Sequence, residues 1–197
     1  MASATSFRHD ILGIPKSSAT PKDSVLVIID AQNEYAKGKL AVSNLESSRA
    51  AIRSLLDKYR QADGKIVHIL HSVPEGAPVF TPGTELEKEF DELKPQGNEK
   101  VIVKKYPGSF AETSLKDELK SLPDEAPGKI VLCGYMAHVC VSTTAREAHQ
   151  LGYDVVLVED AIGDRDIPGA SGEEVTKMVM LELSDMFGTV VKSDEIK

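Results

Sequence analysis

Residues 24–30 read Ser24-Val-Leu-Val-Ile-Ile-Asp30, a nearly continuous apolar run that ends in a carboxylate. A run of this kind is typical of a strand buried on both faces. Five shorter β-branched runs follow, at residues 65–70, 101–103, 130–133, 155–158 and 189–191. Segments with apolar residues at helical spacing lie at about 43–62, 84–94, 112–121, 139–151 and 172–186. Strands that alternate with helices predict an α/β fold, with a mainly parallel sheet between two helical layers.

Composition excludes several classes of protein. The chain has 197 residues, 41% of them hydrophobic, and a formal net charge of −8. This apolar content excludes intrinsic disorder, and a total of two cysteines, Cys133 and Cys140, excludes a disulfide scaffold. An acidic chain without an evident basic face is not expected to bind nucleic acid. Because no break in composition marks a second domain, we expect an N-terminal extension over residues 1–22 and one domain over 23–197.

The same sequence carries no recognisable targeting signal. Its first residues hold no apolar run of signal-peptide length, and no later stretch approaches the roughly 18 apolar residues that a membrane span needs. We therefore expect a cytoplasmic protein with reduced thiols and no membrane partner.

The common nucleotide-binding motifs are missing. Asp30-Ala-Gln-Asn-Glu-Tyr35 follows the first strand, where a dinucleotide-binding protein would carry G-x-G-x-x-G, and no phosphate-binding G-x-x-x-x-G-K-[ST] occurs. The G-x-S-x-G turn of serine hydrolases is also missing. We expect no cofactor.

Three reactive side chains follow predicted strands, at the sheet edge where α/β proteins place their sites. They are Asp30, Lys104 and Cys140. Each has a plain structural interpretation: a turn aspartate, a surface lysine and an inert buried cysteine, the last of which we accept for Cys133. Cys140, however, stands where a helix begins, and the positive end of the helix dipole favours a thiolate.

Together these three residues make chemical sense. A carboxylate can take the thiol proton and return it to a leaving amine. An ammonium group lowers the energy of the thiolate and keeps the carboxylate ionised. The turn from Gly134 to Cys140 can direct backbone N–H groups at an oxyanion. The set suits covalent acyl transfer by a cysteine.

At this point the chain resembles the isochorismatase-like cysteine hydrolases, which include nicotinamidases, N-carbamoyl amide hydrolases and isochorismatase itself. The resemblance spans residues 22–192 and rests on three ordered motifs. These are Val27-Ile-Ile-Asp-Ala-Gln-Asn33, the lysine six residues before Phe110, and Gly134 six residues before Cys140-Val, followed by Glu159-Asp-Ala161. It implies a six-stranded sheet of order 3-2-1-4-5-6 in a three-layer α/β/α sandwich.

The resemblance also implies roles in a catalytic triad. Cys140 would be the nucleophile, Asp30 the general base and acid, and Lys104 the electrostatic support, with Lys105 as the alternative. A cis peptide would join Tyr135 to Met136, and the amides of Met136 and Cys140 would form the oxyanion hole.

One departure from the family concerns metal. Nicotinamidases bind an ion through an Asp-x-His pair after the second strand, but Val67-His-Ile-Leu-His-Ser-Val-Pro74 contains no aspartate. His68 and His71 are three residues apart and would point to opposite faces of a strand. We expect no metal, and we interpret His71 as a polar strand terminus or a contact near the pocket.

Side chains beside the three motifs are candidate contacts for a small-molecule substrate, with apolar packing as the alternative. They are Gln32, Tyr35, Phe80, Tyr106, Phe110, Tyr135 and His138. The Pro- and Gly-containing segment 72–83 is expected to form a loop that acts as a lid or an oligomer contact. The family's habit of assembling implies a homo-oligomer, a dimer or a tetramer.

Three functions remain open. The first is a cysteine hydrolase that cleaves the C–N bond of a small amide or ureido compound through a thioester, and the presence of Cys140 favours it. The second is an isochorismatase, which hydrolyses an enol ether to pyruvate and a dihydroxy-cyclohexadiene carboxylate and needs an acid such as Asp30 but no nucleophile. The third is a non-enzymatic interaction protein with a vestigial pocket.

Overall fold

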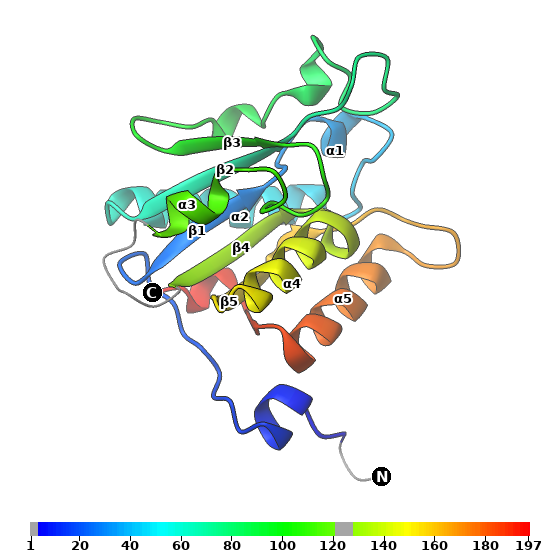
Figure 1. The fold of residues 1–197 in the computed structure, drawn as a ribbon. Helices are drawn as coiled ribbons and strands as arrows, with labels where there is room; N and C mark the ends of the chain where they lie inside the picture. Colours follow the sequence, from blue (N-terminus) through cyan, green and yellow to red (C-terminus); the bar gives the residue numbers. More distant parts are fainter. Residues whose placement is uncertain (1–3, 121–127) are drawn as a thin grey trace.

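A computed structural model describes residues 4–120 and 128–197 and contains one six-stranded sheet (Figure 1). All five strand pairs are parallel, in the order β3-β2-β1-β4-β5-β6. The strands are β1 (Ser24–Ile29), β2 (Lys65–His71), β3 (Lys100–Lys104), β4 (Lys129–Tyr135), β5 (Asp154–Gly163) and β6 (Thr189–Val191). The predicted fold class and the strand order implied by the resemblance are confirmed.

Two helical layers cover the sheet. The helices are α1 (Glu34–Lys37), α2 (Leu45–Gln61), α3 (Leu115–Lys120), α4 (Ser142–Gln150) and α5 (Gly172–Met186). In Figure 1, α3, α4 and α5 lie in front of the sheet and α2 lies behind it. Alternate residues of β1 serve the two layers: Val25, Val27 and Ile29 pack with α3 to α5, while Leu26 and Ile28 pack with α2. Every residue of β1 is therefore buried.

The predicted helix over 84–94 is wrong. Two short 3₁₀ turns, Glu85–Glu87 and Asp91–Leu93, replace it. Between them Glu89 pairs as an antiparallel bridge with Gln32, and the Phe90 amide donates to the Ala31 carbonyl at 2.9 Å. Because backbone groups of this segment are hydrogen-bonded to the chain that follows β1, they are not available for the hydrogen bonds of a helix.

Two other helices differ at their ends. The helix predicted from 112 begins at Leu115, since Glu112 adopts a left-handed φ of 54°; position 121 lies outside the described residues. The helix predicted over 139–151 is a π-helical turn, Ala137–Val141, that continues into α4.

The N-terminal segment lies against α5 and β5 (Figure 1). The Phe7 amide donates to Asp185 at 2.8 Å, and the Ser17 hydroxyl donates to Asp154 at 2.6 Å. The boundary between an extension and a domain after residue 22 stays a prediction. Within the described residues, no helix combines the length and apolar character needed to cross a membrane.

Gly134 allows the two central strands to meet, and replacing it tests this contact. It faces Ile29 in the sheet with a φ of 113°, and a methyl group there would overlap the Ile29 carbonyl oxygen. We expect Gly134→Ala to lower the free energy of unfolding by more than about 3 kcal/mol. Gly76→Ala, at a φ of 83° with open space around it, should cost only about 1 kcal/mol. Equal losses in chemical denaturation would contradict the overlap.

Candidate active site

Asp30, Lys104 and Cys140 meet at the carboxyl edge of the sheet. Asp30 directly follows β1, Lys104 ends β3, and Cys140 lies in the π-helical turn after β4. The Lys104 ammonium is 2.8 Å from Asp30 Oδ2 and 3.4 Å from Cys140 Sγ. The three residues are 0%, 1% and 5% exposed, respectively. Side chains that are 110 positions apart in the chain, from 30 to 140, thus form one buried cluster.

Local backbone geometry brings these groups together. Asp30 has a left-handed φ of 49°, which turns the chain out of β1, and its amide donates to the Ile69 carbonyl at 2.9 Å. The peptide between Tyr135 and Met136 is cis, and the turn that carries Cys140 begins directly afterwards. Lys105, the alternative for the supporting cation, is exposed, whereas Lys104 is buried within the cluster.

Burial controls the protonation of the cluster. It raises the pKa of the Asp30 carboxyl, although Lys104 opposes the shift. Burial and the neighbouring Asp30 charge also raise the pKa of the Cys140 thiol to about 12, and Lys104 offsets only part of this effect. The thiolate expected from the helix position is therefore not the resting form of Cys140, because desolvation outweighs the helix dipole.

Two aromatic side chains complete the surroundings. His71 Nδ1 lies 3.2 Å from the Lys104 ammonium, and burial together with this cation lowers the pKa of His71 to about 4, so the ring is a neutral acceptor. Burial and the neighbouring Asp30 raise the pKa of Tyr35 well above its usual value, and Cys140 contributes to the same shift. Lys104 also donates to the Tyr106 carbonyl at 3.1 Å.

The predicted contact residues separate into two groups. Tyr35 and Phe80 lie beside the cluster, with ring centroids 5.3 Å apart, and Tyr106 reaches it through its backbone while its side chain is largely exposed. The other side chains have partners of their own. Gln32 binds the backbone of His71 and Glu87, Tyr135 binds Ser48, His138 binds Asp164, and Phe110 stacks on Tyr153.

His71, interpreted from the sequence as a polar strand terminus or a contact near the pocket, lies against Lys104. Two further residues were missed as parts of the site. Asp164 is fully buried and accepts from both the amide and the ring of His138 at the start of the Cys140 turn. Glu34 is buried and binds the backbone of two loops. The spacing of Asp30, Gln32 and Glu34, every second residue after an apolar strand, was the one available signal.

The histidines of β2 lie apart. His68 is buried between Glu89, at 2.8 Å, and Glu99, at 3.1 Å, whereas His71 contacts Lys104. Over residues 4–120 and 128–197, no group of three or more His, Cys, Asp or Glu side chains is placed to hold a metal ion.

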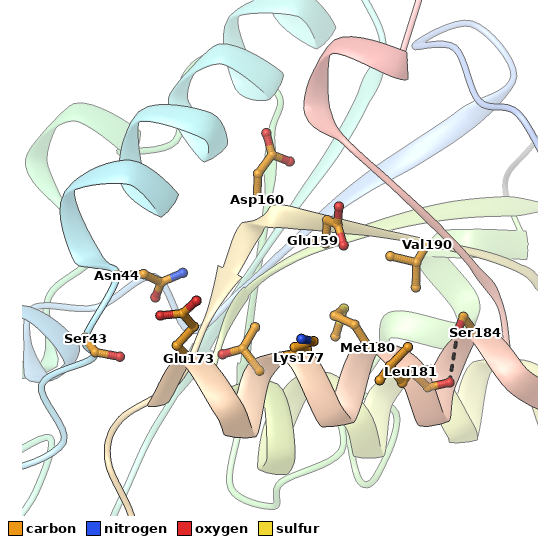
Figure 2. A pocket seen from close by; sticks show the side chains of 11 residues that line it. Ser43, Asn44, Glu159, Asp160, Glu173, Lys177, Met180, Leu181, Ser184 and Val190 are labelled. Atoms are coloured by element: carbon orange, nitrogen blue, oxygen red, sulfur yellow. Dashed lines mark hydrogen bonds between the residues drawn. The ribbon is translucent and has the colours of Figure 1, made fainter. Parts of the chain in front are cut away.

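An open cavity of about 630 Å³ lies elsewhere, between α5, β5, β6 and the start of α2 (Figure 2). Figure 2 shows its polar end at Asn44 and Glu173 and its apolar end at Leu181 and Val190. Its lining contains none of the three clustered residues. The three clustered residues therefore lie outside this cavity.

Comparisons with known proteins agree on one family. The isochorismatase domain family matches residues 24–195. The secreted isochorismatase effector Isc1 of Verticillium dahliae is 55% identical over 98% of this chain and 99% of that protein. An isochorismatase structure from Pseudomonas putida has a TM-score of 0.92 at 31% identity, over 99% of this chain and 100% of that one. N-carbamoylsarcosine amidase from Thermoplasma acidophilum has a TM-score of 0.74 at 25% identity, over 89% and 99%.

The raised pKa of Cys140 predicts a characteristic reactivity. Because a thiol with a pKa of about 12 is almost fully protonated near neutrality, its alkylation rate should rise about tenfold per pH unit from pH 6 to pH 9. Iodoacetamide labelling followed by peptide mass spectrometry measures this rate, with the fully buried Cys133 as an unreactive internal control. A plateau below pH 9 would show that the thiolate is stabilised instead.

His71 should contribute to acid sensitivity. The folded protein keeps this ring neutral down to about pH 4, whereas the unfolded chain protonates it below its ordinary pKa of 6.5. Between these values the unfolded state binds more protons, so stability falls as the pH drops. We expect the free energy of unfolding of His71→Asn to fall by about 1–2 kcal/mol less than that of the wild type between pH 7 and pH 4. This figure allows for solvent screening, because the His71 ring is partly exposed. Chemical denaturation at several pH values measures the difference; parallel curves would count against this assignment.

Proposed function

This chain belongs to the isochorismatase family of hydrolases, and we propose that it hydrolyses the enol ether of isochorismate to pyruvate and a dihydroxy-cyclohexadiene carboxylate. The sequence alone favoured C–N bond cleavage, with this reaction as the alternative. The observation that carries the proposal is the buried Asp30 carboxyl, whose raised pKa suits a proton donor. The 55% identity with a protein named an isochorismatase supports the same activity.

The reaction begins with proton transfer to carbon. Protonated Asp30 donates to the methylene carbon of the enol ether, which leaves a cationic centre on the adjoining ether carbon. The Asp30 carboxylate formed in this step is stabilised by the Lys104 ammonium 2.8 Å away. In this scheme the ion pair is strengthened in the transition state, which is the condition for catalysis.

Water then completes the hydrolysis. It adds to the cationic carbon and releases one proton, which restores the acid form of Asp30. The resulting hemiketal transfers its hydroxyl proton to the ring oxygen as the carbon–oxygen bond breaks, giving pyruvate and the ring alcohol. Cys140 forms no covalent bond in this scheme, and its thiol stays protonated at a pKa of about 12.

Cysteine hydrolysis of a C–N bond is the second candidate. The complete set of Asp30, Lys104 and Cys140 and the likeness to an N-carbamoylsarcosine amidase support it. Asp30 would take the thiol proton, Cys140 would attack the carbonyl, and the amides of Met136 and Cys140 would hold the oxyanion. Its weakness is that the resting thiol must first lose a proton at a pKa of about 12.

Location and assembly are separate questions. The predicted cytoplasmic location stays a prediction, and the Verticillium dahliae relative, named a secreted effector, makes secretion the other candidate. Immunodetection in culture supernatant and in cell extract distinguishes them. The homo-oligomer also stays a prediction, which size-exclusion chromatography with light scattering tests.

Parallel assays separate the two reactions. Isochorismate is followed by a coupled pyruvate assay, and a panel of amides and N-carbamoyl amino acids by release of amine. We expect isochorismate turnover, and we expect Asp30→Asn to lower kcat by about 10²–10⁴-fold, as loss of a general acid does. The fold decrease in kcat caused by Cys140→Ala should be at least about tenfold smaller than that caused by Asp30→Asn, since the scheme needs no nucleophile.

Asp57→Asn, on the exposed face of α2, and Cys133→Ala serve as matched controls for the two side-chain types. Turnover of an amide that disappears in Cys140→Ala, without any pyruvate from isochorismate, would establish the second candidate in place of the first.

A further inference from the structure

The deep burial of the catalytic cluster raises the question of access. Asp30, Lys104 and Cys140 are at most 5% exposed, which leaves little of their surface open to a ring-sized substrate. The segment over residues 72–88, which connects β2 to the 3₁₀ turns, is half-buried or exposed at every position except Phe80. Phe80 is only 4% exposed, which makes it the inward-pointing anchor of an otherwise open loop.

Phe80 covers the two aromatic neighbours of the cluster. Its ring packs edge-on against Tyr35 at 5.3 Å and against His71 at 5.1 Å. Tyr35 in turn reaches Cys140, and His71 contacts Lys104. The Phe80 ring is thus one residue removed from both the thiol and the ammonium group.

A buried carboxylate holds Phe80 by its backbone. Glu34 Oε2 accepts from the Phe80 amide at 3.0 Å, and Oε1 accepts from the Leu40 amide at 3.2 Å. Glu34 is fully buried, and Gly38 lies so close to its carboxylate that a side chain at 38 would overlap it. Hydrogen bonds to a charged acceptor are about twice as strong as neutral ones.

The backbone of Phe80 needs such a bond. Its φ of 48° is left-handed, a conformation that is unfavourable for a bulky L-residue and persists only where surrounding contacts hold it. Without Glu34 the residue would relax toward an ordinary conformation, and the ring would leave its place between Tyr35 and His71.

We propose that Glu34 is a positioning residue that, through the Phe80 amide, holds the Phe80 ring as a cover over the catalytic cluster, and that this cover opens to admit the substrate and closes on its ring. Glu34 lies four residues after Asp30, so one short stretch carries both the acid and the anchor of the cover. The closing of the ring on a cyclic substrate rests on the proposed function. The access role does not, because it concerns any molecule that approaches Cys140.

Alkylation tests access independently of any substrate. We expect Glu34→Gln and Phe80→Ala to raise the rate of iodoacetamide labelling at Cys140 at least about tenfold at a fixed pH, while Cys133 stays unlabelled. Glu85→Gln, on an exposed carboxylate of the same connection, should leave both rates unchanged. Wild-type rates at Cys140 in both variants would overturn the proposal. Equal acceleration at Cys140 and Cys133 would also overturn it, since that pattern reports global unfolding.

Kinetics of isochorismate hydrolysis give the second readout. Phe80→Ala should raise KM more than it lowers kcat, because the cover contacts the substrate ring but not the reacting carbon. Glu34→Gln should do the same, since a neutral amide oxygen is a weaker acceptor for the Phe80 amide than the carboxylate. No activity in the wild type together with accelerated labelling would reject the proposed reaction and keep the cover. Isochorismate turnover in the wild type, together with unchanged labelling of Cys140 in the variants, would support the proposed reaction and reject the cover.

Discussion

The buried contact between Lys104 and Asp30 is the interaction on which the site depends. It joins the end of an edge strand, β3, to the turn after a central strand, β1, at 2.8 Å and without solvent exposure. A buried ammonium group needs an acceptor, and removing one partner of such a buried pair costs about 3–5 kcal/mol. The strand order and the length of β2, which lies between them, must therefore be maintained for the pair to exist.

The same pair explains how one set of residues can serve two chemistries. With a proton on Asp30 the site is an acid beside a cation, which suits an enol ether. With the proton of Cys140 moved to Asp30, it is a nucleophile beside an acid, which suits an amide. The difference lies in one proton, and burial controls its position through the pKa values of both groups.

Sequence patterns predicted the strands and the three clustered residues well, because buried parallel strands are apolar and the motifs stand at strand ends. The strand order came only from the family resemblance. Local patterns failed where tertiary contacts decide. Residues 84–94 have apolar residues at helical spacing, yet the antiparallel bridge between Glu89 and Gln32 keeps the middle of this segment extended instead of helical. The helix position of Cys140 indicated a thiolate, but the burial that raises its pKa depends on tertiary packing. His71 became a neighbour of Lys104 only through the register of β2 with β3.

The hydrogen bond from Phe80 to Glu34 involves the main chain of Phe80, not its ring. The hydrogen bond that holds the loop therefore does not depend on which side chain stands at position 80. Another side chain could replace the Phe80 ring while the backbone bond to Glu34 is kept. A substitution at position 80 would therefore change the ring that packs on Tyr35 and His71 without altering Asp30, Lys104 or Cys140.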